Sequence, residues 1–124
     1  MPYVDGFVLP VWKKNVQAYR RLSLAAGKVW KEHGALEYRE CVADQLTIPD
    51  EHGKKVSPFP HLLRLKPGET VFFSWIVYRS RAHRDQVNAK VMKDPRLANM
   101  MDPKALPFDA KRMIYGGFSV VVDL

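Results

Sequence analysis

The stretch from Thr70 to Lys93 decides the fold, and it reads TVFFSWIVYRSRAHRDQVNAKVMK. Its first part, VFFSWIVY, is aromatic and β-branched, which predicts a strand. Side chains alternate between the two faces of a strand, and both faces of this one are apolar except for Ser74. The strand therefore needs cover on both sides. Ser80 then supplies an N-cap oxygen for the helix that follows.

The rest of the chain predicts strands over residues 3–9, 35–46 and 112–123, and a first long helix over residues 14–33. We expect Pro10 to end the first strand and Gly34 to stop the helix. Residues 60–65 and 95–101 are expected to form short helices, the second with Asp94 as its cap. Two adjacent glycines, Gly116 and Gly117, predict a bulge or bend in the last strand.

This order is strand–helix–strand, a long connection at 47–69, and strand–helix–strand again. It predicts a single α+β domain over residues 1–124 with a ferredoxin-like βαββαβ fold. The four antiparallel strands take the order 4-1-3-2, and both long helices cover one face of the sheet. Nothing is left to cover the other face. Because so large an apolar patch is exceptional in a monomer, we expect a homodimer that pairs sheet against sheet.

Composition bounds the protein class. The chain has 124 residues, of which 47% are hydrophobic and 27% are charged, as in a soluble globular domain. No apolar run approaches the ~20 residues that span a bilayer, and no basic region precedes the first apolar run as in a signal peptide. A lone cysteine, Cys41, forms no internal disulfide. These features predict a cytoplasmic protein without a membrane segment.

The net charge of +7 raises the question of a nucleic-acid partner. The basic residues are spread along the chain in pairs such as Lys13-Lys14, without a dense block, which is more typical of solvated surfaces. RNA-recognition modules also have ferredoxin-like sheets with aromatic central strands. The strand VFFSWIVY lacks their basic-Gly-aromatic-Gly opening, however, and a sheet face that forms a dimer is not free to stack bases. The sequence thus argues against nucleic-acid binding.

Metal and nucleophile chemistry are weakly indicated. The four histidines, His33, His52, His61 and His83, lie far apart without a chelating spacing, so we expect no metal and no cofactor. Cys41 lies mid-strand and is best explained as a small packing residue. The chain has no G-x-S-x-G elbow and no glycine-rich phosphate loop.

Acid–base chemistry has better candidates. Asp5 is a carboxylate in an apolar strand row, which requires a hydrogen bond or a basic partner, and His83 lies in the first turn of the second long helix. We predict these two as catalytic residues of a pocket between sheet and helices. The predicted substrate-binding residues around them are Tyr38, Arg39, Trp75, Tyr78 and Tyr115. The alternative is that Asp5 and His83 are core residues with their hydrogen bonds satisfied, and that the aromatic rings only pack in the core.

Five segments, VDGFVLPV, WKEHGALEYRECVAD, FFSWIVYRSRAHRD, NAKVMKDPRL and FDAKRMIYGGFSVVVD, resemble a bacterial family classed as a domain of unknown function. That family is similar in turn to the dimeric α+β barrel superfamily, in which two ferredoxin-like sheets form one barrel. Its relatives include antibiotic-biosynthesis-type monooxygenases, muconolactone isomerase-like proteins and haem-degrading enzymes. The resemblance implies the fold and the dimer, and it supplies no functional residues to carry over.

Together, these features predict a cytoplasmic homodimer that binds a small, aromatic or carbonyl-bearing metabolite. Its activity would be that of a cofactor-independent monooxygenase or an isomerase-like enzyme. Two alternatives stay open: a non-catalytic binding or stress-related module, and a basic nucleic-acid-associated protein.

Overall fold

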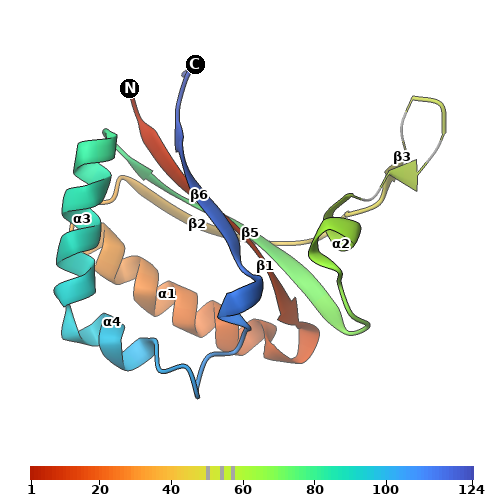
Figure 1. Cartoon of the computed structure of the whole chain (residues 1–124), viewed down its shortest axis with the longest axis horizontal. Helices are drawn as coiled ribbons and strands as arrows, with labels where there is room; N and C mark the ends of the chain where they lie inside the picture. The colour runs from red at the N-terminus through yellow and green to blue at the C-terminus, as the bar shows by residue number, and fades with distance from the viewer. Residues whose placement is uncertain (50, 54, 57) are drawn as a thin grey trace.

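A four-stranded antiparallel sheet forms the centre of the protein in the computed structural model, which describes residues 1–49, 51–53, 55–56 and 58–124. The strands are β1 (Tyr3–Trp12), β2 (Glu37–Val42), β5 (Glu69–Tyr78) and β6 (Ile114–Ser119). Their order is β2-β5-β1-β6 (Figure 1). Since β5 and β6 are the third and fourth strands of the sheet along the chain, this confirms the predicted order 4-1-3-2 and the ferredoxin-like fold.

Three helices cover one face of the sheet (Figure 1). They are α1 (Val16–Glu32), α3 (Arg81–Lys93) and α4 (Pro95–Met100), and a short 3-10 turn, η1 (Lys13–Asn15), leads into α1. The predicted caps are confirmed: the Ser80 side chain accepts a hydrogen bond from the His83 backbone N–H, and the Asp94 side chain accepts one from the Arg96 backbone N–H. Gly34 follows α1 with φ +117°, a conformation that glycine adopts without strain.

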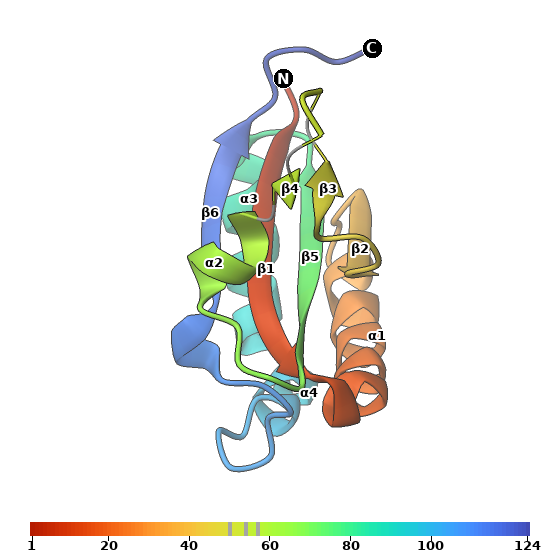
Figure 2. The same cartoon turned by 90° about the vertical axis from the view of Figure 1, so that its right-hand side faces the viewer.

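The connection at 47–69 contains β3 (Ile48–Pro49), β4 (Lys55–Val56) and α2 (Pro58–Leu63). Three of its positions, Asp50, Lys54 and Ser57, lie outside the described residues. Figure 2 shows α2 in front of the sheet, on the side away from α1 and α3. The prediction that nothing covers this face is therefore wrong for one end of it, where Leu63, Glu69 and Val71 are buried.

Two details of the strands differ from the sequence prediction. β1 continues through Pro10 to Trp12, because β6 pairs only as far as Val8 and a proline beyond that point breaks no bond to β6. β6 has no break in its pairing at Gly116 and Gly117, so the predicted bulge is wrong. Gly117 instead gives room to Tyr3, whose ring a Cβ at this position would overlap.

The buried core lies between the sheet and the three helices. One cluster joins α1, β5, α3 and α4 and contains Val29, Ala35, Ile76, Tyr78, Val87, Val91 and Leu97. A second cluster joins β1, α1 and β5 and contains Leu9, Val11, Tyr19 and Phe72. The opposite sheet face stays apolar and open over much of its area. Phe73 is 48% exposed there, and Phe118 is 61% exposed.

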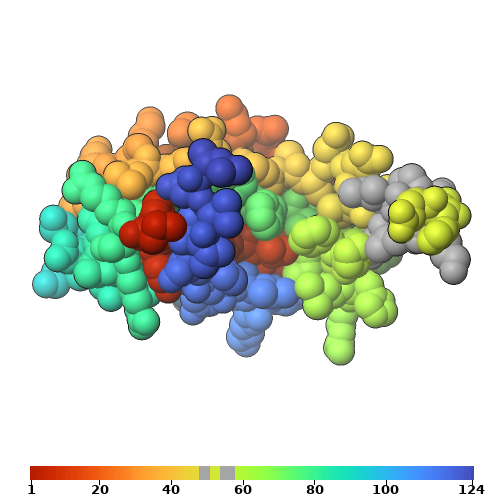
Figure 3. Space-filling view, turned by 90° about the horizontal axis from the view of Figure 1, so that it is seen from above, coloured from red at the N-terminus to blue at the C-terminus, as the bar shows by residue number. Residues whose placement is uncertain are grey.

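The two ends of the chain lie together. The backbone N–H of Val120 donates a hydrogen bond to the Pro2 carbonyl, beyond the last pair of β1 and β6. Figure 3 shows the end of the chain, in blue, beside its start, in red. At the other end of β6, Arg112 of η2 (Ala110–Arg112) pairs with the buried Glu69 carboxylate and donates to the Leu63 and Arg64 carbonyls. Arg112, which lies just before β6, thus joins the start of β5 to the end of α2 and to the residue that follows it.

Candidate ligand-binding site

Strand pairing places a row of side chains across the helix-facing side of the sheet. Glu40 on β2 pairs with Ser74 on β5, Ser74 with Phe7 on β1, and Phe7 with Tyr115 on β6. The neighbouring row contains Tyr38, Ile76, Asp5 and Gly117. Because side chains two residues apart on a strand share a face, both rows point toward the helices.

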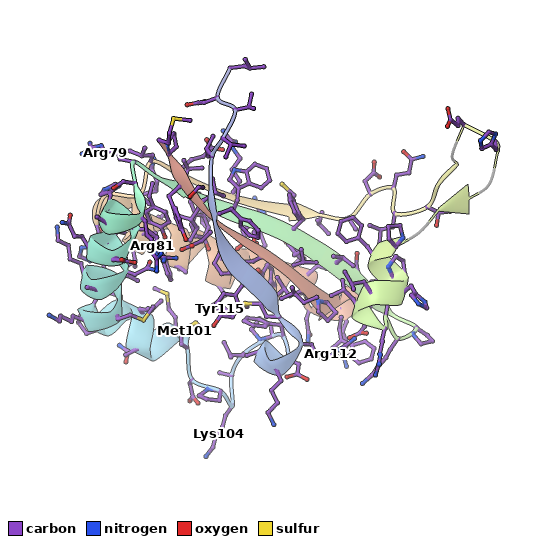
Figure 4. All side chains as sticks on the ribbon, turned by 45° about the horizontal axis from the view of Figure 1, so that its top comes forward. Arg79, Arg81, Met101, Lys104, Arg112 and Tyr115 are labelled. Carbon is purple, nitrogen blue, oxygen red and sulfur yellow. The ribbon has the colours of Figure 1, made fainter. Side chains whose placement is uncertain are left out.

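A cavity of about 490 Å³ lies between these rows and the helices, and we call it the central cavity. Five of the seven predicted site residues line it: Asp5, Tyr38, Arg39, Tyr78 and Tyr115. Its wall also includes residues that the sequence analysis did not single out for the site, among them Tyr19, Ser23, Trp30, Glu40, Ser74, Arg84 and Asn88. Two of the lining residues, Tyr115 on β6 and Met101 just after α4, are labelled in Figure 4. A mostly apolar cavity of this size with a few polar groups is typical of small-molecule sites.

The structure does not bring His83 and Trp75 into the lining of this cavity. His83 accepts a hydrogen bond at Nδ1 from the Arg79 backbone N–H, at 3.0 Å, and its ring meets the Tyr78 ring edge-on. His83 thus lies in the first turn of α3, where its side chain is held against the end of β5. Trp75 points to the opposite sheet face, where its indole N–H donates to the Glu37 carboxylate at 2.9 Å and its ring packs against Phe73.

Asp5 is paired with a base, which is one of the environments that the sequence analysis allows for it. Its carboxylate, in a residue only 8% exposed, accepts a hydrogen bond from the Arg84 guanidinium of α3 at 2.7 Å. The same guanidinium bonds the exposed Asp85 and lies 4.9 Å from the centre of the Tyr3 ring. Nearby, the side-chain oxygen of Asn88 accepts hydrogen bonds from the Trp30 indole and the Tyr78 hydroxyl.

Glu40 is the centre of a second polar group, which we call the carboxylate cluster; its members are Tyr19, Ser23, Tyr38, Glu40 and Ser74. The Tyr19 hydroxyl donates to one Glu40 oxygen at 2.9 Å, and the Tyr38 hydroxyl donates to the other at 3.2 Å. Burial raises the pKa of Glu40, and the hydrogen bonds from the four hydroxyl groups lower it by less. Burial, together with the Glu40 charge, raises the pKa of both tyrosines far above its ordinary value, so they stay protonated donors.

A further cavity of about 540 Å³, the edge cavity, opens between α1 and the edge strand β2. It shares Ser23, Tyr38 and Glu40 with the central cavity, so the carboxylate cluster forms part of the wall of both. Two exposed cations of α1, Arg20 and Lys28, line the edge cavity. Glu40 is therefore an acidic group that lies between the central cavity and the edge cavity.

A signal for Glu40 existed in the sequence. Glu40 shares one face of its strand with Tyr38 and Val42, and it is the charged residue among them. Ser74 is the one residue of VFFSWIVY that is neither aromatic nor aliphatic. Pairing these two strands in the observed register places the two polar exceptions opposite each other. The register depends on the whole sheet, however, and was not deduced from the sequence.

Two kinds of feature are absent from the described part of the chain. Within it, no group of three or more His, Cys, Asp and Glu side chains has an arrangement that could hold a metal ion. None of the helices formed by the described residues has both the length and the apolar character needed to cross a membrane.

The family model described as "Protein of unknown function (DUF1428)" matches residues 2–110. The chain belongs to the DUF1428 family. A protein of similar sequence is "Uncharacterized protein YbaA" of Escherichia coli K12. The two are 43% identical over 123 residues, which covers 99% of each chain. YbaA of Shigella flexneri matches with the same identity and coverage.

Solved structures show the same fold at low sequence identity. Rv0793 from Mycobacterium tuberculosis is 15% identical with a TM-score of 0.53, and the match covers 99% of this DUF1428 chain and 98% of the other. A NIPSNAP domain protein from Burkholderia xenovorans is 12% identical with a TM-score of 0.53, covering 96% and 94%. A protein from an uncultured marine organism, described as a dimeric ferredoxin-like protein, is 12% identical with a TM-score of 0.51 and full coverage of both chains.

Proposed function

We propose that this chain acts as a homodimer that binds a small organic metabolite in the central cavity. The observation that carries this proposal is the cavity itself: about 490 Å³ between sheet and helices, with an aromatic wall and two separate polar groups. One polar group is the Asp5–Arg84 ion pair, and the other is the carboxylate cluster around Glu40. Apolar walls supply affinity for such a molecule, and a few fixed polar groups orient it.

The dimer is supported by the open sheet face. Phe73, Trp75 and Phe118 lie on it, and a solved structure of the same fold is described as dimeric. Pairing two such faces would bury the apolar surface and form one barrel from two sheets. The segment around α2 covers only the end of this face near Val71, which leaves the remainder for a second copy.

For the ligand contacts we propose Asp5, Tyr38, Tyr78 and Tyr115, which line the cavity. Arg39 also borders the cavity, but its guanidinium bonds Glu37 on the opposite face of the sheet, so its role in binding stays a prediction. The roles predicted for His83 and Trp75 stay predictions, to be tested by the same assays. The enzymatic form of the proposal is a cofactor-independent monooxygenase or an isomerase-like enzyme, since both need a group that accepts a proton from the substrate. Asp5 is engaged by Arg84, and Glu40 is a further carboxylate with a raised pKa. The free, exposed Cys41 supports a cytoplasmic location, where thiols stay reduced.

A thermal-shift screen against metabolites tests the proposal, because a ligand that binds only the folded state raises the melting temperature. We expect hits among small aromatic and carbonyl compounds, and we expect Tyr78→Phe and Asp5→Asn to weaken them. Turnover of a hit in air, without an added cofactor, would identify an enzyme. Binding without turnover would favour the non-catalytic module. A screen in which no metabolite raises the melting temperature, or in which the hits bind equally to variants with a filled cavity such as Ser74→Phe, contradicts the proposal.

A further inference from the structure

Glu40 is partly buried, and it differs in its partners from the two buried acids. Asp5 pairs with Arg84, and Glu69 pairs with Arg112. Among the residues that the structure describes, no Lys, Arg or His nitrogen forms an ion pair with Glu40, whose hydrogen-bond donors are hydroxyl groups. A carboxylate that is partly removed from water and has no countercharge is costly even when it is hydrogen-bonded. Some positive charge, a proton or a ligand, should therefore be favoured at this position.

The guanidinium groups that line the central cavity are engaged by other carboxylates, and the exposed Arg20 and Lys28 line only the edge cavity. In the central cavity, Arg84 bonds Asp5 and Asp85, and Arg39 bonds Glu37 on the opposite side of the sheet. Each of these guanidinium groups thus has at least one carboxylate of its own. The unpaired charge of the central cavity is the negative charge of Glu40.

The cavity wall beside Glu40 is aromatic. Tyr19 donates to Glu40 and its ring meets the Phe108 ring edge-on, with 5.6 Å between the ring centres. Tyr38, the other donor, lies 6.2 Å from the Trp30 ring. All four residues line the central cavity. Aromatic faces attract cations, and Trp and Tyr do so most strongly.

We propose that the ligand of the central cavity carries a protonated amine that lies against Glu40, on an aromatic or apolar body that fills the rest of the cavity. This inference rests on the proposed function and names the chemical class of its ligand. Each carboxylate oxygen accepts more than one hydrogen bond, so the ammonium group can bind while Tyr19 and Tyr38 keep theirs. The charge of the amine then replaces the missing basic side chain.

The proposal has a defined pH dependence. Only the ionised Glu40 attracts an ammonium group, so the affinity for an amine falls as the pH falls through the pKa of Glu40, and the affinity for a neutral analogue does not. Burial raises that pKa, which brings the change closer to neutral pH. The titratable and charged groups around Glu40 are Tyr19, Arg20 and Lys28 of α1, Tyr38 and Arg39 of β2, and the Asp5–Arg84 pair.

Three probes of similar shape separate the possibilities: 2-phenylethylamine, which is cationic, 2-phenylethanol, which is neutral, and phenylacetate, which is anionic. Their dissociation constants are measured by calorimetry with the full chain, at several pH values. We expect the amine to bind about tenfold more tightly than the alcohol near neutral pH, and phenylacetate to bind least. Glu40→Gln should remove the preference for the amine and keep the binding of the alcohol.

Glu37→Gln is the matched control, because Glu37 lies on the same strand and points to the opposite sheet face, where it bonds Trp75. It should keep the preference for the amine. If Glu40→Gln does not fold, the amine-to-alcohol ratio of the wild-type protein and its fall in acid still decide the question. Equal binding of amine and alcohol, or tighter binding of phenylacetate, overturns the ammonium preference and leaves the proposed cavity intact. Absence of binding by all three probes at millimolar concentration overturns both.

Discussion

The hydroxyl group of Tyr19 on α1 donates a hydrogen bond to the Glu40 carboxylate on β2, with 2.9 Å between the two oxygens. This hydrogen bond fixes a helix to an edge strand and stabilises a partly buried negative charge. Tyr19→Phe removes the donor and keeps the ring that packs on Phe72. We expect it to lower the free energy of unfolding by about 2 kcal/mol, as for a hydrogen bond to a charged group, in urea denaturation. Tyr115→Phe, at an exposed ring, should change it by less than about 0.5 kcal/mol. Equal effects of the two variants would contradict this assignment.

Glu40 should make stability depend on pH in the opposite direction from Glu32 and Glu69, whose pKa values are lowered by their arginine partners. Its pKa is raised by burial in the folded protein, so its contribution to stability is full below the ordinary glutamate pKa and is lost as the pH rises through the folded value. Each unit of such a rise corresponds to about 1.4 kcal/mol. Glu40→Gln should therefore gain stability relative to wild type as the pH rises above about 4, which melting curves in a pH series measure.

The matched control is Glu32→Gln on the exposed end of α1. Hydrogen bonding and charge from Arg96 lower the pKa of Glu32, so its contribution is present above the ordinary glutamate pKa and is lost as the pH falls. The difference in stability between Glu32→Gln and the wild-type protein should thus become smaller as the pH falls. Parallel pH profiles for the two glutamine variants would refute a raised pKa at Glu40.

Arg84 bonds two aspartates of different burial, which predicts unequal costs for losing them. The Asp5 side chain is 11% exposed and the Asp85 side chain is 61% exposed. Asp5→Asn should lower the free energy of unfolding by about 2–3 kcal/mol, because it leaves a partly buried guanidinium with less compensation. Asp85→Asn should cost less than about 1 kcal/mol. Chemical denaturation compares the two, and a larger loss for Asp85→Asn would contradict this account.

Phe73 should belong to the dimer contact and not to the monomer core. Its side chain is about half exposed on the open sheet face. Phe73→Lys should convert a dimer to a monomer in sizing chromatography with light scattering, because a buried unpaired charge is costly in an apolar interface. Leu24→Lys, at a similarly exposed leucine on α1, should stay dimeric. A wild-type chain that is monomeric at micromolar concentration would refute the dimer.

Packing decides whether replacing Gly27 by alanine stabilises or destabilises the protein. Alanine is favoured over glycine in a helix by about 1 kcal/mol. A Cβ at Gly27, however, would lie 2.6 Å from the Tyr38 ring, which is held by its hydrogen bond to Glu40. Gly27→Ala should therefore destabilise the protein by about 1–2 kcal/mol. In a Tyr38→Ala background the same change should become stabilising, and a loss that persists in this double-mutant cycle would show that Tyr38 is not the cause.

Local chemistry was enough to predict the elements around Ser80 and Asp94. Each has a short oxygen-bearing side chain directly before a helix, and each caps that helix in the structure. The aromatic strand β5 and its central position were predictable for the same reason, since VFFSWIVY is apolar on both faces. The length of β1 was not, because whether Pro10 ends a strand depends on how far β6 runs beside it.

For the site, the sequence indicated five of the residues that line the central cavity, since their aromatic or charged character and strand positions are local properties. The sequence analysis also predicted His83 and Trp75 as site residues. In the structure the His83 ring bonds the backbone at the start of α3, and Trp75 lies on the opposite face of the sheet. Which side of a sheet faces the helices, and where a helix axis passes, are decided by packing of the whole domain.

The sequence alone determined the ferredoxin-like order of strands and helices, because hydrophobic periodicity and capping residues are encoded in neighbouring positions. Only the tertiary structure decided that Glu40 is a partly buried acid that forms no ion pair with a basic side chain of the described residues. Its hydroxyl donors come from α1, β2 and β5, and β5 lies far along the chain from α1 and β2. The pKa of a carboxyl group depends on what surrounds it in three dimensions, and residues far apart in sequence supply that surrounding.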